Sequence, residues 1–250
     1  MSALSLIGAT ARLDGRGVLS EVDLSILPGE VVALTGPNGA GKTSVIRAMT
    51  GVLPLSGGEA RLEGRPLAAF GPRERAARLA WLPQDRRIAW NMPAVEVAAL
   101  GAPFLSGAAA RDRALAALME IDAGRLAARG VAEMSGGERA RVLFARFLAT
   151  EAPILLADEP AAGLDPDAQL LVMDVLRRRA EAGAAVLVSL HDLSLAARHA
   201  DRVVVMDRGS IAADGAPREA LAPEVMRAVF GVGARWLETP QGPVLNSWRL

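Results

Sequence analysis

The sequence has no cysteine, no tyrosine and no long hydrophobic run. Without cysteine, the chain can form neither a disulfide nor a thiolate metal site, and it has no cysteine nucleophile. Its apolar runs, such as residues 184–190, are far shorter than the roughly 20 residues that a membrane-spanning helix needs. Residues 1–15 lack the charged and apolar regions of a signal peptide.

Charge of one sign is not in excess either, since 28 Lys and Arg residues balance 28 Asp and Glu residues. This balance argues against the basic surface of a nucleic-acid-binding protein, and we expect no nucleic-acid partner. With 250 residues, 51% of them hydrophobic, the chain is long enough for a sizeable core, in one large domain or in a domain with an added lobe.

The hydrophobic pattern predicts an α/β protein. Short apolar runs bounded by turn residues predict buried strands of a mostly parallel sheet at 31–34, 154–157, 184–190 and 203–206. Helical spacing predicts helices over 41–51, 111–121, 137–149, 167–182 and 192–199.

Three further segments flank this core. The alternating segment before residue 30, together with 58–66, predicts antiparallel strands. The Ala-rich stretch 93–130 predicts an inserted helical lobe, and residues 235–250 predict a small hairpin.

A glycine-rich loop follows the apolar run 31–34 and precedes a helix, the context in which G-x-x-x-x-G-K-[ST] binds phosphates. The glycines let backbone N–H groups turn toward phosphate oxygens, and the helix start adds partial positive charge. Lys42 would reach the β- and γ-phosphates, and Thr43 would offer a hydroxyl to Mg²⁺. We expect nucleotide contacts from Gly36, Pro37, Asn38, Gly39, Ala40, Gly41, Lys42, Thr43 and Ser44.

Lys42 is also the only lysine of the chain. A genome that favours arginine codons explains most of this bias. The one remaining lysine therefore marks a position where a planar guanidinium would replace a compact ammonium poorly.

Two carboxylates follow the apolar run 154–157. Asp158, at the end of the strand, is suited to hold Mg²⁺ through water, opposite Thr43. Glu159 would then face the γ-phosphate as the base that orients and polarises the attacking water.

The tripeptide Ser-Gly-Gly occurs twice, in LSGGEA at 55–60 and in MSGGERA at 134–140. The first copy continues with alternating residues and predicts a turn into an edge strand. The second precedes a helical pattern, with Ser135 as N-cap and Glu138 completing a capping box. Because bare N–H groups at a helix start bind anions, we assign the function to the second copy.

Taken in order, these motifs are similar to those of the ATP-binding-cassette (ABC) ATPases. The series is GPNGAGKT, Gln84 in WLPQ, MSGGE, ILLADEP, Asp165 in GLD, and His191, and it covers nearly the whole chain. The resemblance implies a P-loop NTPase core with a mostly parallel sheet, an antiparallel β subdomain and an α-helical subdomain inserted at about 90–150. Residues 1–233 would form this single domain, and 234–250 a short hairpin extension.

The resemblance also implies that two copies pack head to tail around two ATP molecules with Mg²⁺. Lys42, Thr43, Gln84, Asp158, Glu159 and His191 of one copy would face Ser135, Gly136 and Gly137 of the other. Gln84 would contact Mg²⁺ and the attacking water, His191 the γ-phosphate, and Asp165 would bridge the copies. The other histidine, His199, is expected at the surface.

The sequence departs from the family pattern in several places. Met134 replaces the usual leucine of the signature, and Glu138 replaces glutamine; both changes are conservative. The family commonly places an aromatic residue for adenine stacking near residue 13, which is Leu13 here. An apolar contact from Leu13, or a cation–π contact from Arg12 or Arg16, would have to replace it.

Cassettes of this kind power a membrane permease, whose coupling helix sits in a groove near residues 84–92. The stretches 78–84 and 221–232 resemble those of importers of metal chelates, namely ferric siderophores, haem and cobalamin. We therefore expect an ATP-hydrolysing importer subunit that its permease holds at the inner face of the cell membrane. A periplasmic binding protein would be an indirect partner.

Two other functions stay open at this point. A soluble ABC ATPase that serves an assembly machine, such as iron–sulfur scaffold loading, has nearly identical nucleotide motifs. A small-molecule kinase is disfavoured, because it has no use for the second anion site before the Asp158 strand. The cargo itself is not readable, because the cassette never touches it.

Overall fold

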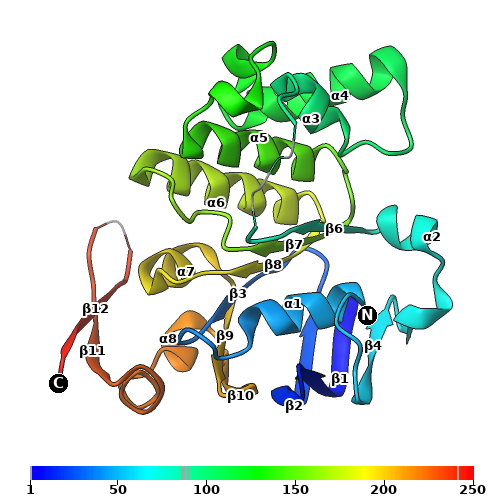
Figure 1. The fold of residues 1–250 in the computed structure, drawn as a ribbon. Coiled ribbons are helices and arrows are strands. Elements are labelled where there is room, and N and C mark those ends of the chain that lie inside the picture. The colour runs from blue at the N-terminus through cyan, green and yellow to red at the C-terminus, as the bar shows by residue number, and fades with distance from the viewer. Residues whose placement is uncertain (1, 86–87, 89, 241) are drawn as a thin grey trace.

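The protein is described by a computed structural model that covers residues 2–85, 88, 90–240 and 242–250. Its central sheet has the strand order β10 (Ser210–Gly215), β9 (Arg202–Asp207), β3 (Val31–Thr35), β8 (Ala185–Ser189), β7 (Ile154–Asp158) and β6 (Leu79–Leu82) (Figure 1). Neighbours from β9 to β6 pair in parallel, and β10 pairs antiparallel with β9. The predicted mostly parallel sheet is confirmed.

Both faces of this sheet are covered, which explains its continuous apolar strands. In β3, Val31 and Ala33 face one hydrophobic cluster, whereas Val32 and Leu34 face another. Because successive side chains of a strand point to opposite faces, such a strand is apolar along its length, up to the polar last residue that each of these strands carries at the site edge. All five residues of β3, β7 and β8 are buried.

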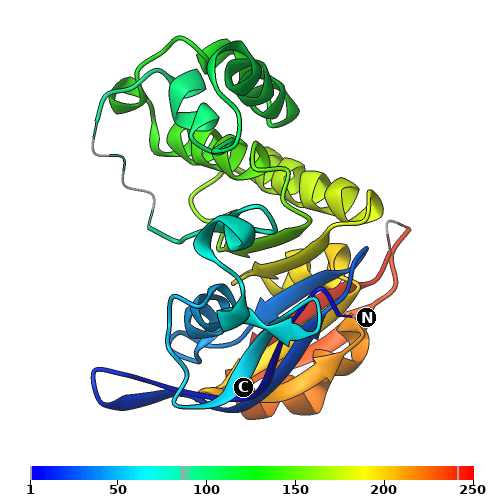
Figure 2. The ribbon, with the colours of Figure 1, turned by 90° about the vertical axis from the view of Figure 1, so that its right-hand side faces the viewer.

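A separate antiparallel sheet has the order β2 (Arg16–Ile26), β1 (Leu4–Leu13), β4 (Gly57–Leu62) and β5 (Arg65–Pro66). Helix α1 (Lys42–Thr50) lies between the two sheets, and its Val45, Ile46 and Met49 are fully buried there. Figure 2 shows the antiparallel strands at one end of the molecule and the helical lobe at the other.

The helical lobe contains α3 (Ala94–Ala99), α4 (Gly107–Glu120) and α5 (Gly136–Leu148), with 3₁₀ turns at Gly124–Leu126 and Val131–Glu133. Helix α5 joins the lobe to the core, because it packs on α3 and α4 and also contacts β6. Its buried side chains include Leu143, Phe144 and Phe147. Helix α6 (Pro166–Glu181) lies between the lobe and the central sheet (Figure 1).

The remaining elements are short. They are a 3₁₀ turn at Leu67–Ala69, α2 (Pro72–Ala76), α7 (Leu193–His199), α8 (Pro217–Ala220), α9 (Pro223–Val225) with a π-helical turn at Met226–Phe230, and the hairpin β11 (Val232–Leu237) and β12 (Val244–Arg249). In the described part of the chain, no helix has both the length and the apolar character for a membrane span.

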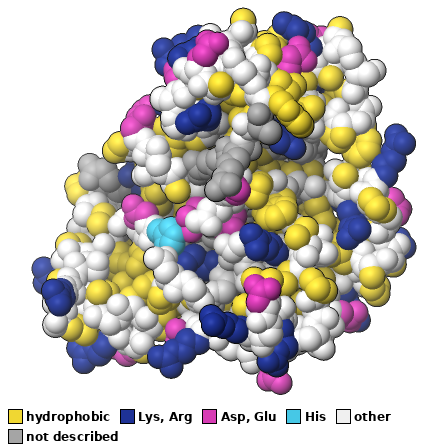
Figure 3. All heavy atoms as spheres, in the orientation of Figure 1, with side chains coloured by type: hydrophobic (Ala, Val, Ile, Leu, Met, Phe, Trp, Pro, Cys, Tyr) yellow, Lys and Arg dark blue, Asp and Glu magenta, His cyan; other side chains and the backbone are white. Residues whose placement is uncertain are grey.

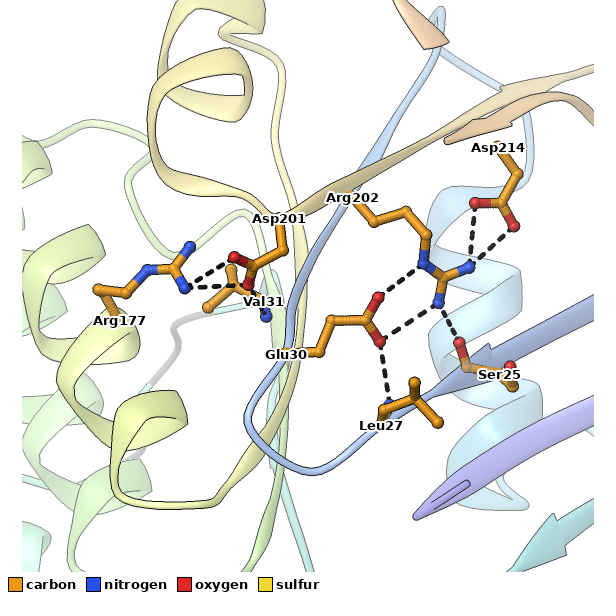
Figure 4. A network of polar contacts seen from close by, with 8 residues as sticks. All are labelled: Ser25, Leu27, Glu30, Val31, Arg177, Asp201, Arg202 and Asp214. Atoms are coloured by element: carbon orange, nitrogen blue, oxygen red, sulfur yellow. Dashed lines mark hydrogen bonds and ion pairs between the residues drawn. The ribbon is translucent and has the colours of Figure 1, made fainter. Parts of the chain in front are cut away.

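An ionic network joins the sheets at the edge where β3 and β9 begin (Figure 4). Arg202 donates to Glu30 at 2.7 Å and to Asp214 at 2.9 Å, and it also bonds the carbonyl of Ser25. Burial opposes the charge of Arg202, but these two carboxylates outweigh it and raise the pKa of Arg202. The guanidinium thus links β9, β10, β2 and the turn before β3.

The structure corrects some sequence predictions. Helix α4 begins at Gly107 rather than 111, and the hairpin begins at Val232 rather than 235. The prediction of a surface His199 is wrong: its side chain is only 10% exposed, with Nδ1 3.8 Å from Asp174 Oδ1. Burial lowers the pKa of His199, an effect that Asp174 opposes and that Arg198 and Arg177 support.

Candidate nucleotide site

A cavity of about 520 Å³ lies where β3, β7 and β8 end. Its walls come from segments far apart in the sequence: Val18, residues 38–44, Gln84, Glu159 and His191. The carboxyl ends of parallel strands meet at one edge of a sheet, which is why these loops converge. Figure 3 shows acidic side chains and a histidine gathered in the hollow between the upper helices and the lower layers.

The glycine-rich loop has a backbone that only glycine adopts readily. Gly36 has φ of 141°, and a Cβ there would lie 2.3 Å from the carbonyl oxygen of Met206. Gly41 has φ of 108° and caps α1 without any side-chain hydrogen bond, so the first N–H groups of the helix stay available for a ligand. The loop thus has the backbone geometry that an anion site needs.

Lys42 spans this loop from the inside. Its side chain is buried, and Nζ donates to the carbonyls of Gly36 at 2.8 Å and Pro37 at 3.2 Å. Burial lowers the pKa of Lys42, while Glu159 and Asp158 act in the opposite direction. Gly36 and Pro37 therefore position the lysine, whereas residues 38–44 line the cavity.

Asp158 ends β7 and is almost completely buried. Its Oδ1 accepts a hydrogen bond of 2.6 Å from Ser189 Oγ, and among the described residues its Oδ2 has no hydrogen-bond partner. A buried carboxylate oxygen without a partner is costly unless a cation or a bound water satisfies it. Half-buried Thr43 lines the adjacent cavity.

Glu159 lies between the two other predicted catalytic side chains. Gln84 Nε2 donates to Glu159 Oε2 at 2.9 Å, and His191 Nε2 pairs with Glu159 Oε1. The backbone of Glu159 is left-handed, with φ of 52°, and its N–H donates to Ser189 Oγ at 2.9 Å. The structure therefore brings the three predicted catalytic side chains together, but it also shows Glu159 engaged by both of its neighbours.

The capping box at the start of α5 forms as the sequence predicted. Ser135 Oγ accepts from the Glu138 N–H at 3.2 Å, and Glu138 Oε2 accepts from the Ser135 N–H at 2.9 Å. That bond to the Ser135 N–H is the main cause of the lowered pKa of Glu138. A Cβ added at Gly136 would meet no atom within 4 Å, so the start of α5 is open. None of Ser135, Gly136 and Gly137 lines the cavity at Lys42.

The first Ser-Gly-Gly is a strand entrance. Gly57 begins β4, and the Ser56 N–H donates to the carbonyl of Thr10 at 2.7 Å. Gly58 has φ of 73°, and a Cβ there would lie 2.3 Å from the carbonyl oxygens of Ile7 and Gly8. The close approach of β1 requires this glycine, so the predicted turn into a strand is confirmed. The predicted edge position is wrong, because β4 pairs with β1 on one side and with β5 on the other.

Two predictions concern contacts with other chains: Asp165 was expected to bridge two copies, and the groove at 84–92 to receive a permease helix. Asp165 caps α6 through a 2.9 Å bond from the Ala168 N–H, and its Oδ2 lies 3.4 Å from Arg141. Its side chain is nonetheless 62% exposed, so one face stays accessible. The predicted groove at 84–92 lies partly outside the described residues.

The cavity lining includes none of the three residues that the sequence suggested for adenine contact, Arg12, Leu13 and Arg16. Arg12 is occupied, because its guanidinium donates to the carbonyl of Gly15 at 2.6 Å. Leu13 and Arg16 do not line the cavity, whereas Val18 does. Val18 and Ser189 are the two site residues that the sequence motifs missed, because neither belongs to a motif.

Comparisons with known proteins agree with this geometry. The family model for ABC transporters matches residues 19–162. This chain belongs to the ABC transporter family. It is an ATPase of that family, and its nucleotide is ATP.

The chain is similar to the hemin import ATP-binding protein HmuV of Myxococcus xanthus, at 45% identity, covering 92% of this chain and 90% of that protein. The corresponding protein of Nocardia farcinica is 43% identical, covering 90% and 80%.

A solved ATP-binding subunit of an ABC transporter is 28% identical, with a TM-score of 0.78, covering 92% and 94%. A dimeric ATP-binding cassette bound to ADP and Pi is 27% identical, with a TM-score of 0.76, covering 86% and 99%.

Proposed function

We propose that this ABC ATPase powers a membrane importer of metal chelates, with haem as the leading cargo, and that two copies enclose two ATP molecules. The observation that carries the proposal is the separation of two complementary anion sites. One is the loop around Lys42, with Gln84, Glu159 and His191, and the other is the open start of α5 at Ser135. Within one chain, the start of α5 does not line the cavity at Lys42, so it cannot contact a nucleotide bound there.

The head-to-tail dimer gives that second site its role. The bare N–H groups at Gly136 and Gly137 would contact the γ-phosphate held by Lys42 of the other copy. The exposed side of Asp165 would face the same boundary. A similar cassette has been solved as a dimer in a post-hydrolysis state, which supports this arrangement.

The residues present fit a magnesium ion. Oxygen donors are what Mg²⁺ prefers. The site offers a buried carboxylate oxygen of Asp158 that has no hydrogen-bond partner in the described part of the chain, the Thr43 hydroxyl and the Gln84 amide. These three residues would hold the ion. Bound with ATP, Mg²⁺ neutralises charge that develops on the phosphates during transfer.

The protein side chains then divide the work of hydrolysis. Lys42 and the loop amides bind and orient the phosphates, and Glu159 accepts a hydrogen bond from the attacking water and polarises it. Gln84 and His191 contact both Glu159 oxygens and hold the carboxylate in place. When ATP enters, His191 would exchange part of this contact for the γ-phosphate.

A permease coupling helix has a fitting groove. A cavity of about 420 Å³ lies between β6 and α5, with Leu82, Leu100, Leu143 and Phe147 in its walls. Leu100 is 54% exposed, and nearby Phe104 and Leu105 are also exposed, so apolar surface continues at its rim. An amphipathic helix is a suitable occupant of such a groove.

Docking there would place the chain at the cytoplasmic face of the membrane, with a periplasmic binding protein on the other side of the permease. The names of the similar proteins favour import over iron–sulfur scaffold loading. We assign residues 1–233 to the ATPase unit and 234–250 to an extension.

Co-purification tests the importer function. The chain is expressed with its chromosomal neighbours, and complexes are isolated in detergent. A polytopic membrane protein that stimulates ATP hydrolysis supports the proposal. A soluble scaffold protein in the complex would instead favour the assembly function.

The variant Glu159→Gln tests the hydrolysis mechanism. It keeps the size of the side chain but removes the charge that polarises water, so we expect tight ATP binding, a stable dimer and hydrolysis reduced at least about 100-fold. Size-exclusion chromatography with light scattering measures the dimer. A variant that stays monomeric with saturating ATP would exclude the enclosed-nucleotide arrangement.

A further inference from the structure

The last residue of β8, Ser189, is fully buried and lies directly beside β7. In the parallel register, Ser189 is the partner of Asp158 on one side and of Leu34 on the other. It stands two residues before His191. The side chain is therefore between the carboxylates of β7 and the loop that carries His191.

The hydroxyl of Ser189 uses both of its hydrogen-bonding functions. It donates its proton to Asp158 Oδ1 at 2.6 Å and accepts from the Glu159 N–H at 2.9 Å. A hydroxyl has one proton, so donation to Asp158 turns its lone pairs toward Glu159. One buried atom thus contacts two consecutive residues with different predicted tasks.

The two bonds do different things. The bond to Oδ1 fixes the rotation of the Asp158 carboxylate. Oδ2 then has no partner within the residues that the structure describes and is available for a cation. The bond to the Glu159 N–H holds a backbone at φ of 52°, which a glutamate does not favour by itself. The direction of the Glu159 side chain depends on this backbone.

We propose that Ser189 is a positioning residue for ATP hydrolysis, which aims Asp158 at Mg²⁺ and Glu159 at the attacking water. This inference rests on the proposed function. It adds a residue outside the family motifs, and it connects the metal carboxylate and the base to the strand that leads to His191.

The test compares Ser189→Ala with Ser189→Thr in the full chain. Alanine removes both bonds, so we expect kcat to fall about 10- to 100-fold and the Mg²⁺ concentration for half-maximal activity to rise about 10-fold. ATP affinity measured in EDTA should change less than about 2-fold, because Lys42 and the loop are untouched. Threonine keeps the hydroxyl, and Ser189 lines a cavity of about 100 Å³. Ser189→Thr should therefore need the same Mg²⁺ concentration for half-maximal activity as the wild type.

Val188→Ala is the matched control, because Val188 is the preceding residue of β8 and is also fully buried. It should lower the melting temperature without raising the Mg²⁺ requirement. If Ser189→Ala does not fold, Ser189→Cys takes its place, since a thiol is a weaker donor of similar size, and we expect an intermediate Mg²⁺ requirement.

Two outcomes overturn the inference. One is a Ser189→Ala variant, or Ser189→Cys in its place, with wild-type kcat and Mg²⁺ dependence, and the other is a Val188→Ala variant with the same Mg²⁺ defect. If the wild-type protein itself shows no Mg²⁺-dependent ATP hydrolysis, the proposed function fails first, and the two failures are distinguishable.

Discussion

The two Ser-Gly-Gly copies give a matched pair of substitutions, Gly58→Ala and Gly136→Ala. At Gly58 a methyl group would meet two carbonyl oxygens at 2.3 Å, and the backbone φ is 73°. At Gly136 a methyl group would meet nothing within 4 Å, and the residue is the first of α5. The same change should therefore damage the fold at one position and the function at the other.

The magnitudes follow from this geometry. A side chain in the left-handed region costs about 1–2 kcal/mol, and forcing strand β1 away adds about 1–3 kcal/mol. We expect Gly58→Ala to destabilise the chain by about 3 kcal/mol, which lowers Tm by about 6–12 °C for a chain of this size. Gly136→Ala should keep or slightly raise Tm, because alanine favours a helix by up to about 1 kcal/mol over glycine.

Differential scanning fluorimetry and ATP hydrolysis measure the pair. We expect Gly136→Ala to lose at least about 10-fold in ATPase activity at wild-type Tm, and Gly58→Ala to keep its activity per folded molecule well below its reduced Tm. Wild-type Tm for Gly58→Ala would refute the structural role of the first copy. Full activity for Gly136→Ala would refute the functional role of the second.

Three further predictions concern single charges. Lys42→Arg should weaken ATP binding at least about 10-fold, because a guanidinium does not fit where Nζ lies against two loop carbonyls; isothermal titration with wild-type affinity would contradict this. Arg202→Met should lower the free energy of unfolding, measured with urea, by about 3 kcal/mol, because it removes the ion-pair partner of two half-buried carboxylates. The control Arg208→Met, at a side chain that is 93% exposed, should change that free energy by less than about 0.5 kcal/mol. Folding lowers the pKa of His199, so the unfolded chain binds more protons, and the free energy of unfolding should fall as pH drops below about 6.5. The variant His199→Phe should lose this part of the pH dependence of Tm. A variant whose Tm depends on pH as the wild type's does would contradict the prediction.

Local patterns predicted the parts of the site that local chemistry determines. The glycine loop before Lys42, the strand before Asp158 and the capping box at Ser135 each need only neighbouring residues, and each forms as predicted. The difference between the two Ser-Gly-Gly copies could also be predicted from the sequence, because the copy at 135–137 precedes a helical pattern and the copy at 56–58 precedes an alternating one.

Contacts between segments far apart in the chain could not be predicted from the sequence. His199 is buried by α6, through Asp174 and Arg177, which a helix-end histidine does not reveal. Ser189 acquires its partners from the register of β8 against β7, and Val18 reaches the cavity through the path of β2. The start of α4 at Gly107 was missed because its first residues are small and carry no hydrophobic period.

The most direct test of the account places Lys42→Ala and Ser135→Arg in dimers of two distinguishable copies, with Glu159→Gln in both so that bound ATP is retained. If each site combines Lys42 of one copy with Ser135 of the other, a dimer with one change on each copy keeps one intact site. A dimer with both changes on the same copy then has none.

We therefore expect about one retained ATP per dimer in the first arrangement and almost none in the second. Retained nucleotide is counted after rapid gel filtration. The reverse result, with ATP retained only when both changes are on the same copy, would show that Lys42 and Ser135 serve the same nucleotide within one chain and would contradict the account.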